Sequence, residues 1–219
     1  MKYAVTMVRV VFFALFMAVM IQGKMMLWLG LIVVSAVAAA LLGRVYCGYI
    51  CPIHTAMEPL EWAVRTRGAK LRGGSPWLGK GVFAWLMLVI SIAVMLLLRR
   101  FWQLSVPIIV VWLVIAVLLS LRYRPEMFHN LICPFGALQN LFGRFARFTT
   151  HVHPEDCTGC RLCEKTCPAA AIHVCSGKAV VNPKWCLQCA RCQRVCPTQA
   201  IHYGQRPAMG VTDGLDVTA

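Results

Sequence analysis

Two copies of one cysteine pattern constrain this chain more than any other feature of its sequence. Each copy reads Cys-x2-Cys-x2-Cys-x3-Cys-Pro, and the copies begin at Cys157 and Cys186. This is the spacing of bacterial proteins that carry two iron–sulfur clusters, whose irons require soft thiolate ligands. Three cysteines of a run wrap one cluster, and the fourth reaches the other because the chain has already turned away. The sequence therefore predicts two [4Fe–4S] clusters, the first held by Cys157, Cys160, Cys163 and Cys196 and the second by Cys186, Cys189, Cys192 and Cys167.

The two copies also match outside the cysteines, since residues 171–173 and 200–202 both read Ala-Ile-His. Each copy is therefore expected to form a loop, a short helix and the start of a strand. Together they predict an α+β domain of the bacterial two-cluster ferredoxin type over residues 149–205. Zinc sites and a disulfide scaffold are the alternatives, but zinc sites usually use two Cys-x2-Cys knuckles each and a disulfide scaffold predicts no internal copy. Cys175 lies outside both runs and is expected to be a packed thiol.

The rest of the chain has the composition of a membrane protein. Hydrophobic residues make up 59% of it, charged residues 14%, and its mean hydropathy is +0.68. The N-terminus resembles a signal peptide, but no small-residue cleavage site follows directly, so we expect a retained helix. A transmembrane helix needs about 20 mostly apolar residues. Four stretches within residues 1–148 meet this requirement and predict an α-helical domain of two pseudo-symmetric hairpins: residues 5–21, 25–43, 81–98 and 101–121.

The distribution of basic residues predicts how these helices cross the membrane. Lysine and arginine are concentrated between the second and third spans and after the fourth, whereas the other two links carry few. Because basic loops stay in the cytoplasm, both termini and the ferredoxin domain are expected on the cytoplasmic side of the inner membrane. A reducing cytoplasm also suits twelve unpaired cysteines. Arg9, near one end of the first span, is expected to extend its charge to the membrane surface.

The helical half contains a second repeated motif. Cys47-x3-Cys51-Pro follows the second span, and His129-x3-Cys133-Pro follows the fourth. Both motifs follow an even-numbered span, so they are expected at the same membrane face. A candidate third metal site is therefore formed by Cys47, Cys51, Cys133 and His129. The simplest form of this site is an iron–sulfur cluster with one imidazole ligand. His54 is a rival fourth ligand. The alternatives are structural cysteines that end one element before a proline, and a redox-active dithiol of Cys47 and Cys51.

The stretches that follow the two motifs, residues 55–66 and 135–148, have amphipathic patterns, and the second is expected to lie at the lipid headgroups. The first contains Glu58 and Glu61. Carboxylates at a membrane boundary can accept protons from a quinol. The favoured interpretation is nevertheless a solvated pair that offsets Arg65 and Arg67 at helical spacing.

The spans, the Cys-x3-Cys-Pro motifs and the two cysteine runs together resemble the NapH-type membrane iron–sulfur proteins, whose relatives include NosR, MauN and CcoG-like proteins. The resemblance extends from the first span to about Tyr203. It implies electron transfer between the quinone pool and a redox partner, or a role in the maturation or regulation of a partner metalloenzyme. The chain differs from this family at His129, where cysteine is common, and the flavin-binding domain of the longer relatives is not expected.

Several other functions are excluded by the sequence. No histidine lies in the four spans and no Cys-x-x-Cys-His occurs, so no haem is expected, and no Gly-x-Gly-x-x-Gly points to NAD. The net charge of +14 lies largely beside the spans, so anionic lipid rather than nucleic acid accounts for it. We therefore expect an electron-transfer subunit of an oxidoreductase complex, of the quinol dehydrogenase type. Its predicted partners are membrane lipid and an oxidoreductase subunit or soluble carrier, and residues 206–219 are expected to form a loose tail.

Overall fold

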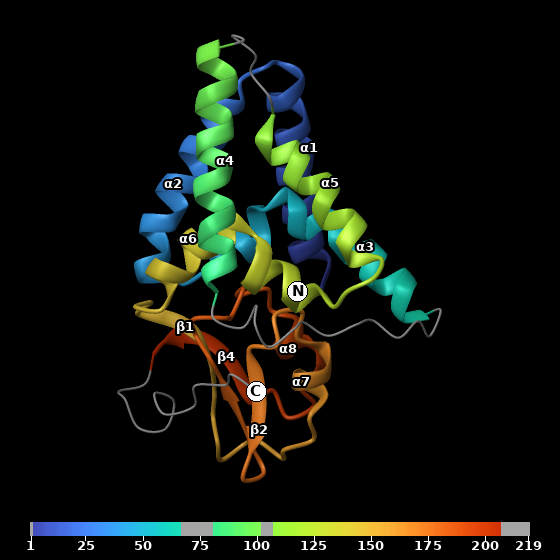
Figure 1. Cartoon of the computed structure of the whole chain (residues 1–219). Coiled ribbons are helices and arrows are strands. Elements are labelled where there is room, and N and C mark those ends of the chain that lie inside the picture. Colours follow the sequence, from blue (N-terminus) through green and yellow to red (C-terminus); the bar gives the residue numbers. More distant parts are fainter. Residues whose placement is uncertain (1, 67–80, 102–106, 207–219) are drawn as a thin grey trace.

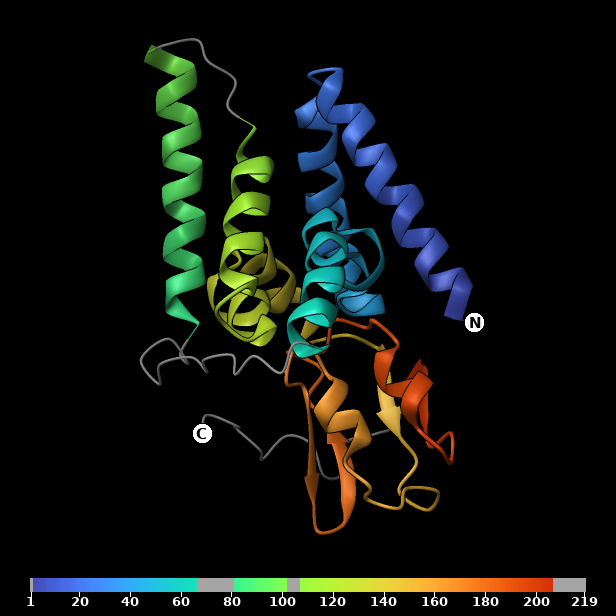
Figure 2. The same ribbon diagram turned by 90° about the vertical axis from the view of Figure 1, so that its right-hand side faces the viewer.

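The computed structural model describes residues 2–66, 81–101 and 107–206 of the chain. A helical half comes first, and a smaller half of short helices and strands packs under one end of it (Figure 1). The second view shows the long helices extending away from the smaller half, with the N-terminal end of the first helix beside it (Figure 2).

The helical half is built from two copies of one succession of elements. Each copy has two helices, a short π-helical turn and a third helix whose first residue is a proline. Proline is favoured at this position because its missing N–H is not needed there. The first copy comprises α1 (Lys2–Ile21), α2 (Met25–Leu42), η1 (Tyr46–Ile50) and α3 (Pro52–Thr66), and the second α4 (Val82–Phe101), α5 (Ile108–Ser120), η3 (Met127–Ile132) and α6 (Pro134–Gly143).

The two copies interlock. Helix α3 packs against α5, and α6 packs against α2, so the last helix of each copy contacts the second helix of the other. The expectation that residues 135–148 lie at the headgroups is wrong for α6, because this helix is built into the bundle. Its Gln139 is fully buried, and Gln139 Nε2 donates to Ser35 Oγ on α2 at 2.7 Å. Interlocking of this kind brings η1 and η3 together in the interior.

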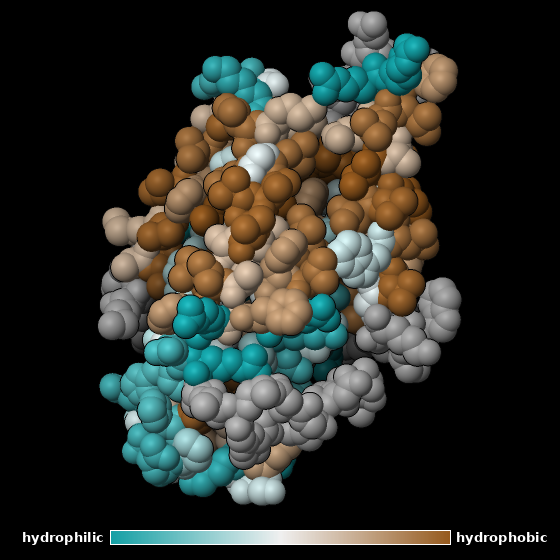
Figure 3. Space-filling view, turned by 90° about the vertical axis from the view of Figure 1, so that its left-hand side faces the viewer, coloured by the Kyte–Doolittle hydropathy of each residue, from teal (hydrophilic) through white to brown (hydrophobic). Residues whose placement is uncertain are grey.

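Three of the helices, α1, α2 and α4, are long and apolar enough to cross a membrane. Many of their apolar side chains are exposed, and Figure 3 shows a hydrophobic surface over the helices and a hydrophilic surface over the smaller half. Helix α5 is apolar but has only 13 residues. Residues 102–106, which belong to the predicted fourth span, lie outside the described part of the chain. The chain is therefore a membrane protein with at least three candidate spans.

The smaller half consists of two β-α-β units, as the internal copy predicts. Its elements are β1 (Phe148–Val152), α7 (Leu162–Thr166), β2 (Ile172–Cys175), β3 (Lys178–Val181), α8 (Arg191–Val195) and β4 (Ile201–Gln205). Strands β1 and β4 pair antiparallel with His151 opposite His202, and β2 and β3 also pair antiparallel.

The loops of the two units turn in the same way. Both have backbone φ angles in the left-handed region at matching offsets from their cysteines, in the pairs Gly159 and Gln188, Arg161 and Ala190, and Ala170 and Gln199. The equivalence of the two cysteine runs therefore extends to their backbone conformation. The prediction for Cys175 is wrong, because its side chain is exposed at the end of β2, beside the hairpin turn, and is not packed.

Candidate functional site

Each predicted set of four cysteines lines a small cavity of its own. Apolar side chains such as Val174 and Ile201 complete the first cavity, and Ile172 and Leu187 belong to the second. We name the sets by their distance from the helical half. The outer cysteine set is Cys157, Cys160, Cys163 and Cys196, and the inner cysteine set is Cys167, Cys186, Cys189 and Cys192.

The chemistry of both cavities fits a [4Fe–4S] cluster. All twelve cysteines are free thiols. Burial raises the pKa of Cys186 and of Cys192, and so does the proximity of the other inner thiols. Four ionised sulfurs therefore need compensating positive charge, which iron would supply. Backbone N–H groups point at two of the sulfurs, from Ala171 to Cys167 Sγ at 3.3 Å and from Ala179 to Cys157 Sγ at 3.4 Å.

A zinc interpretation fits these cavities less well. In the part of the chain that the structure describes, no group of three or more His, Cys, Asp or Glu side chains is placed to hold a metal ion. One ion must touch all of its ligands at about 2.3 Å when they are sulfurs. A four-iron cluster instead presents one iron to each thiolate, so its ligands stand further apart.

The two sets differ in their exposure to solvent. Cys186, Cys189 and Cys192 of the inner set are buried, whereas Cys160 of the outer set is exposed. The inner set faces the helical half, and the outer set lies further from it.

The cysteines and histidines of the helical half meet where η1 and η3 converge. Cys47, Cys51 and Cys133 are buried there, and burial followed by the charges of Cys47 and Cys133 raises the pKa of Cys51. His129 and His54 join them, with His54 Nδ1 3.3 Å from His129 Nε2. The three cysteines and the two imidazoles thus lie in one buried region, although, as for the cysteine cavities, no three of these side chains are placed to hold a single metal ion. We call these five side chains the membrane-face site.

Both imidazoles of the membrane-face site are neutral at ordinary pH. Burial lowers the pKa of His129, and the cationic Arg44 lowers it further. Burial also lowers the pKa of His54, followed by the effect of His129. One ring must therefore donate the hydrogen bond that joins them and the other must accept it, which leaves one unshared nitrogen lone pair, on the donating ring, as a candidate metal ligand.

Arg44 is a buried residue of the same region that the sequence analysis did not single out. Its side chain is buried, and its guanidinium donates to Asn130 Oδ1 at 3.0 Å and to the His129 carbonyl oxygen at 3.3 Å. Its Nη2 also donates to Cys47 Sγ at 3.8 Å. Its position three residues before Cys47 was the signal that could have identified it.

The membrane-face site packs directly on the loops of the inner cysteine set. Asn130 Nδ2 donates to the Ala169 carbonyl oxygen at 2.7 Å, two residues beyond Cys167. Gly48 lies so close to the other inner loop that an added Cβ would be 2.4 Å from the Leu187 carbonyl oxygen. The helical half and the inner cysteine set therefore share one continuous packed region.

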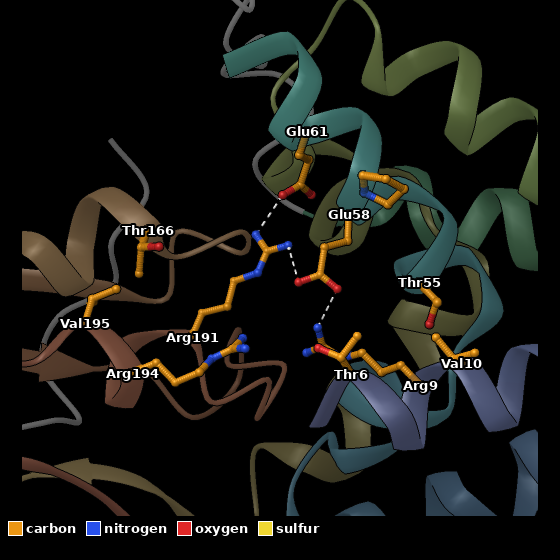
Figure 4. A pocket seen from close by; sticks show the side chains of 11 residues that line it. Thr6, Arg9, Val10, Thr55, Glu58, Glu61, Thr166, Arg191, Arg194 and Val195 are labelled. Carbon is orange, nitrogen blue, oxygen red and sulfur yellow. Dashed lines mark hydrogen bonds and ion pairs between the residues drawn. The ribbon is translucent and has the colours of Figure 1, made fainter. Parts of the chain in front are cut away.

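An ion-pair cluster also connects the helical half to the loops of the inner cysteine set (Figure 4). Arg9 Nη1 contacts Glu58 Oε2 at 2.6 Å, Glu58 Oε1 contacts Arg191 Nη2 at 3.1 Å, and Arg191 Nη1 contacts Glu61 Oε2 at 2.7 Å. Burial alone would raise the pKa of Glu58, but Arg9 and Arg191 outweigh it and hold this pKa below the ordinary value. The cluster joins α1, α3 and α8.

This cluster corrects two expectations from the sequence. Arg9 does not extend to the membrane surface: it is buried, and it also donates to the backbone carbonyls of Gly48 at 2.8 Å and Cys189 at 3.2 Å. Glu61 is buried and paired with Arg191, so the favoured interpretation of a solvated pair is wrong. The predicted partners of the carboxylates, the Arg65 side chain and Arg67, lie outside the described residues.

Comparisons with known proteins agree with this architecture. One family model, described as a 4Fe-4S binding domain, matches residues 25–70 and again 105–152, the two copies in the helical half. A second model with the same description matches residues 150–173 and 179–202. No solved structure matches the chain.

Three curated proteins illustrate the similarity. Two are uncharacterized proteins of Methanocaldococcus jannaschii, one 29% identical over 62% of this chain and 56% of its own length, the other 25% identical over 72% of each chain. The third is the methylamine utilization ferredoxin-type protein MauN of Paracoccus denitrificans, 26% identical over 58% of this chain and 48% of its own. The chain thus spans about half the length of two of these relatives. Together with the apolar helices, the matches show a membrane-associated, ferredoxin-like protein with 4Fe-4S binding domains.

Proposed function

We propose that this protein, as a NapH-type subunit, passes electrons between a carrier in the membrane, most simply a quinol, and a redox partner in the cytoplasm. The inner and outer cysteine sets would each hold one [4Fe–4S] cluster. The membrane-face site would hold a third centre, bound by Cys47, Cys51 and Cys133 and by the imidazole of His129 or His54. Four membrane helices, completed by α5, would carry this assembly in the inner membrane with both termini in the cytoplasm.

The observation that carries this proposal is the direct packing of the membrane-face site on the inner cysteine set. Asn130 and Gly48 belong to the two turns that form the membrane-face site, and each contacts a loop that bears inner cysteines. Arg44 bridges the same gap, since its guanidinium also lies 3.4 Å from the carbonyl oxygen of Trp185, next to Cys186. Electrons that enter at the helical half would therefore reach the inner cluster before the outer one.

The chain's own residues would position the centres and tune them. Iron–sulfur clusters supply one-electron chemistry when they are bound, and the protein sets their position and potential. Arg44, Arg9 and Arg191 place positive charge beside the membrane-face site and the inner loops. These charges favour the more negative, reduced state of a neighbouring centre. The exposed Cys160 marks the end of the relay at which a partner subunit or soluble carrier would dock.

Iron and acid-labile sulfide per purified chain, with EPR of the reduced protein, test this proposal. Two four-iron clusters correspond to about 8 iron atoms. A clearly higher value that falls in a Cys47→Ala/Cys133→Ala double variant supports the third centre. A value near 8 that is unchanged in that variant removes the third centre from the proposal. A value near zero with bound zinc overturns the proposal.

Purification of the natural complex separates electron transfer from the alternative role in maturation. An electron-transfer subunit co-purifies in a fixed ratio with an oxidoreductase, and its clusters are reduced or oxidised during turnover. A maturation factor does not, and its deletion leaves the target enzyme made but inactive.

A further inference from the structure

A cavity of about 710 Å³ lies between the helical half and the ferredoxin domain. Helices α1 and α3 form one wall and α8 forms the opposite wall (Figure 4). Its size falls within the range of about 300–1,000 Å³ that is typical of small-molecule sites. Neither cysteine cavity nor the membrane-face site includes it.

The cavity lies next to surface that a bilayer would cover. Val10 and Thr6 of α1 line it, and Val10 is 57% exposed. The neighbouring Met7 and Val11 are also exposed apolar side chains on the same helix. A ligand with an apolar tail could therefore leave its tail in the lipid along α1 and insert its head into the cavity.

The charges in the cavity favour one chemical class of headgroup over another. Arg9, Arg191, Glu58 and Glu61 form the ion-pair cluster, and among the described residues Arg194 has no ion-pair or hydrogen-bond partner for its side chain. An anionic headgroup would be attracted by Arg194 but repelled by the two carboxylates. A neutral ring with oxygen substituents can donate to a carboxylate and also accept from a guanidinium.

The cavity is also placed for electron transfer. Arg191, which lines it, lies between Cys189 and Cys192 of the inner set in the sequence. Arg9 connects the cavity to the inner loop, because its guanidinium contacts both Glu58 in the cavity and the Cys189 carbonyl oxygen. A redox-active ring in this cavity would therefore be separated from the inner loop by one layer of side chains.

We propose that this cavity binds the headgroup of a quinol, with Arg194 donating to one ring oxygen and Glu58 accepting from a ring hydroxyl. The inference rests on the proposed electron-transfer function and gives its membrane carrier a location. In the oxidising direction both O–H bonds of the quinol break. The two protons pass through the Glu58 carboxylate, 31% exposed, to water. The two electrons would leave one at a time, since a [4Fe–4S] cluster bound by the inner set would accept the first and pass it to the outer set before it accepts the second, and a quinone remains.

Photolabelling with an azido-substituted short-chain quinone tests the location independently of activity. The expected label lies on peptides that contain residues 6–10, 55–61 or 191–195, and decylubiquinone should displace it. Arg194→Gln removes a charged hydrogen-bond donor, so it should weaken the competition by decylubiquinone at least ten-fold. Arg122→Gln, at an exposed arginine away from the cavity, should change it less than two-fold.

A second pair of variants avoids the ion pairs altogether. Val10→Trp would fill the mouth of the cavity and abolish labelling, whereas Val11→Trp, on the adjacent exposed position of α1, would not. Labelling elsewhere, or equal labelling in both variants, overturns the proposed location. So does protection by phosphatidylglycerol vesicles at concentrations at which decylubiquinone gives none, because an anionic lipid then occupies the cavity.

Failure of the location can be told apart from failure of the proposed function. Reduction with dithionite should give EPR signals of iron–sulfur clusters in every variant of these two pairs. If those signals are present and the quinone labels another site, only the location is wrong. If the purified protein binds no iron, the proposed function itself fails.

Discussion

The inner and outer cysteine sets have the same spacing and the same backbone turns but different surroundings. Three inner cysteines are buried, and Cys160 of the outer set is exposed. The difference does not come from the cysteine runs. It comes from the helical half, which contacts the inner loops through Arg9, Gly48 and Asn130. A duplicated motif thus gives two similar cysteine sets, and the rest of the chain decides which set packs against the helical half and which set is more exposed to solvent.

The largest expected effect is on the order in which quinol reduces the clusters of the inner and outer sets. Cys186→Ala and Cys160→Ala should each lose about four iron atoms per chain, since each removes one ligand of one cluster. Added quinol should still reduce the inner cluster of Cys160→Ala, but it should reduce no cluster of Cys186→Ala in the time the intact protein needs. EPR at timed intervals after quinol addition measures both. Rapid reduction of the outer cluster in Cys186→Ala would show that the inner set is not an obligatory step.

The next effect concerns Arg9, a buried cation that joins the helical half to a loop of the inner set. Arg9→Met leaves the Gly48 and Cys189 carbonyl oxygens without this donor and Glu58 with only Arg191. Removal of one partner from a buried charged pair costs about 3–5 kcal/mol, and the partial exposure of Glu58 places this case near 3 kcal/mol. Thermal unfolding in detergent should show the loss. The control, Arg122→Met at an exposed arginine, should unfold like the unaltered protein.

A variant at Gly48 tests the contact between the helical half and the inner loop through steric effects alone. A Cβ here would lie 2.4 Å from the Leu187 carbonyl oxygen and 3.1 Å from Cys189 Cα, so Gly48→Ala must displace the inner loop. Overpacking of this kind costs about 1–3 kcal/mol. Gly30→Ala on α2 is the matched control, because an added Cβ there meets nothing within 4 Å. The EPR signal of the inner cluster should change in Gly48→Ala while that of the outer cluster stays constant. Equal behaviour of the two variants would contradict the direct packing.

The cysteine chemistry could be predicted from the sequence because repeats encode it locally. Both cysteine sets were assigned by spacing, and each lines its own cavity. The second repeat predicted that Cys47, Cys51, Cys133 and His129 lie at one face, and the structure places them in one buried region, where His129 contacts His54. That they bind one centre stays a prediction.

The ionic contacts could not be predicted, because their partners are far apart in the sequence. Arg9 contacts Glu58 across 49 positions and Cys189 across 180. In a span, an arginine near one end normally extends its charge to the headgroups, and no local pattern indicates a buried partner. The prediction for Cys175 failed for a related reason. A free thiol is usually buried, but the hairpin between β2 and β3 places this one at a surface turn.

The smallest expected effect is the pH dependence of folding stability that arises from the buried histidines of the membrane-face site. Burial lowers the pKa of His54 and of His129, so folding keeps both rings neutral. The unfolded chain takes up protons below its ordinary histidine pKa of about 6.5, so stability is fully present above that pH and falls below it, by about 1.4 kcal/mol per pH unit for each histidine. Anaerobic thermal unfolding between pH 5.5 and 7.5 measures this slope. His54→Gln should make it shallower by one proton, whereas His202→Gln, at an exposed histidine of β4, should leave it unchanged. A slope unaffected by His54→Gln would mean that the His54 imidazole is accessible to protons in the folded protein, and the membrane-face site would then resemble the outer cysteine set in its access to water.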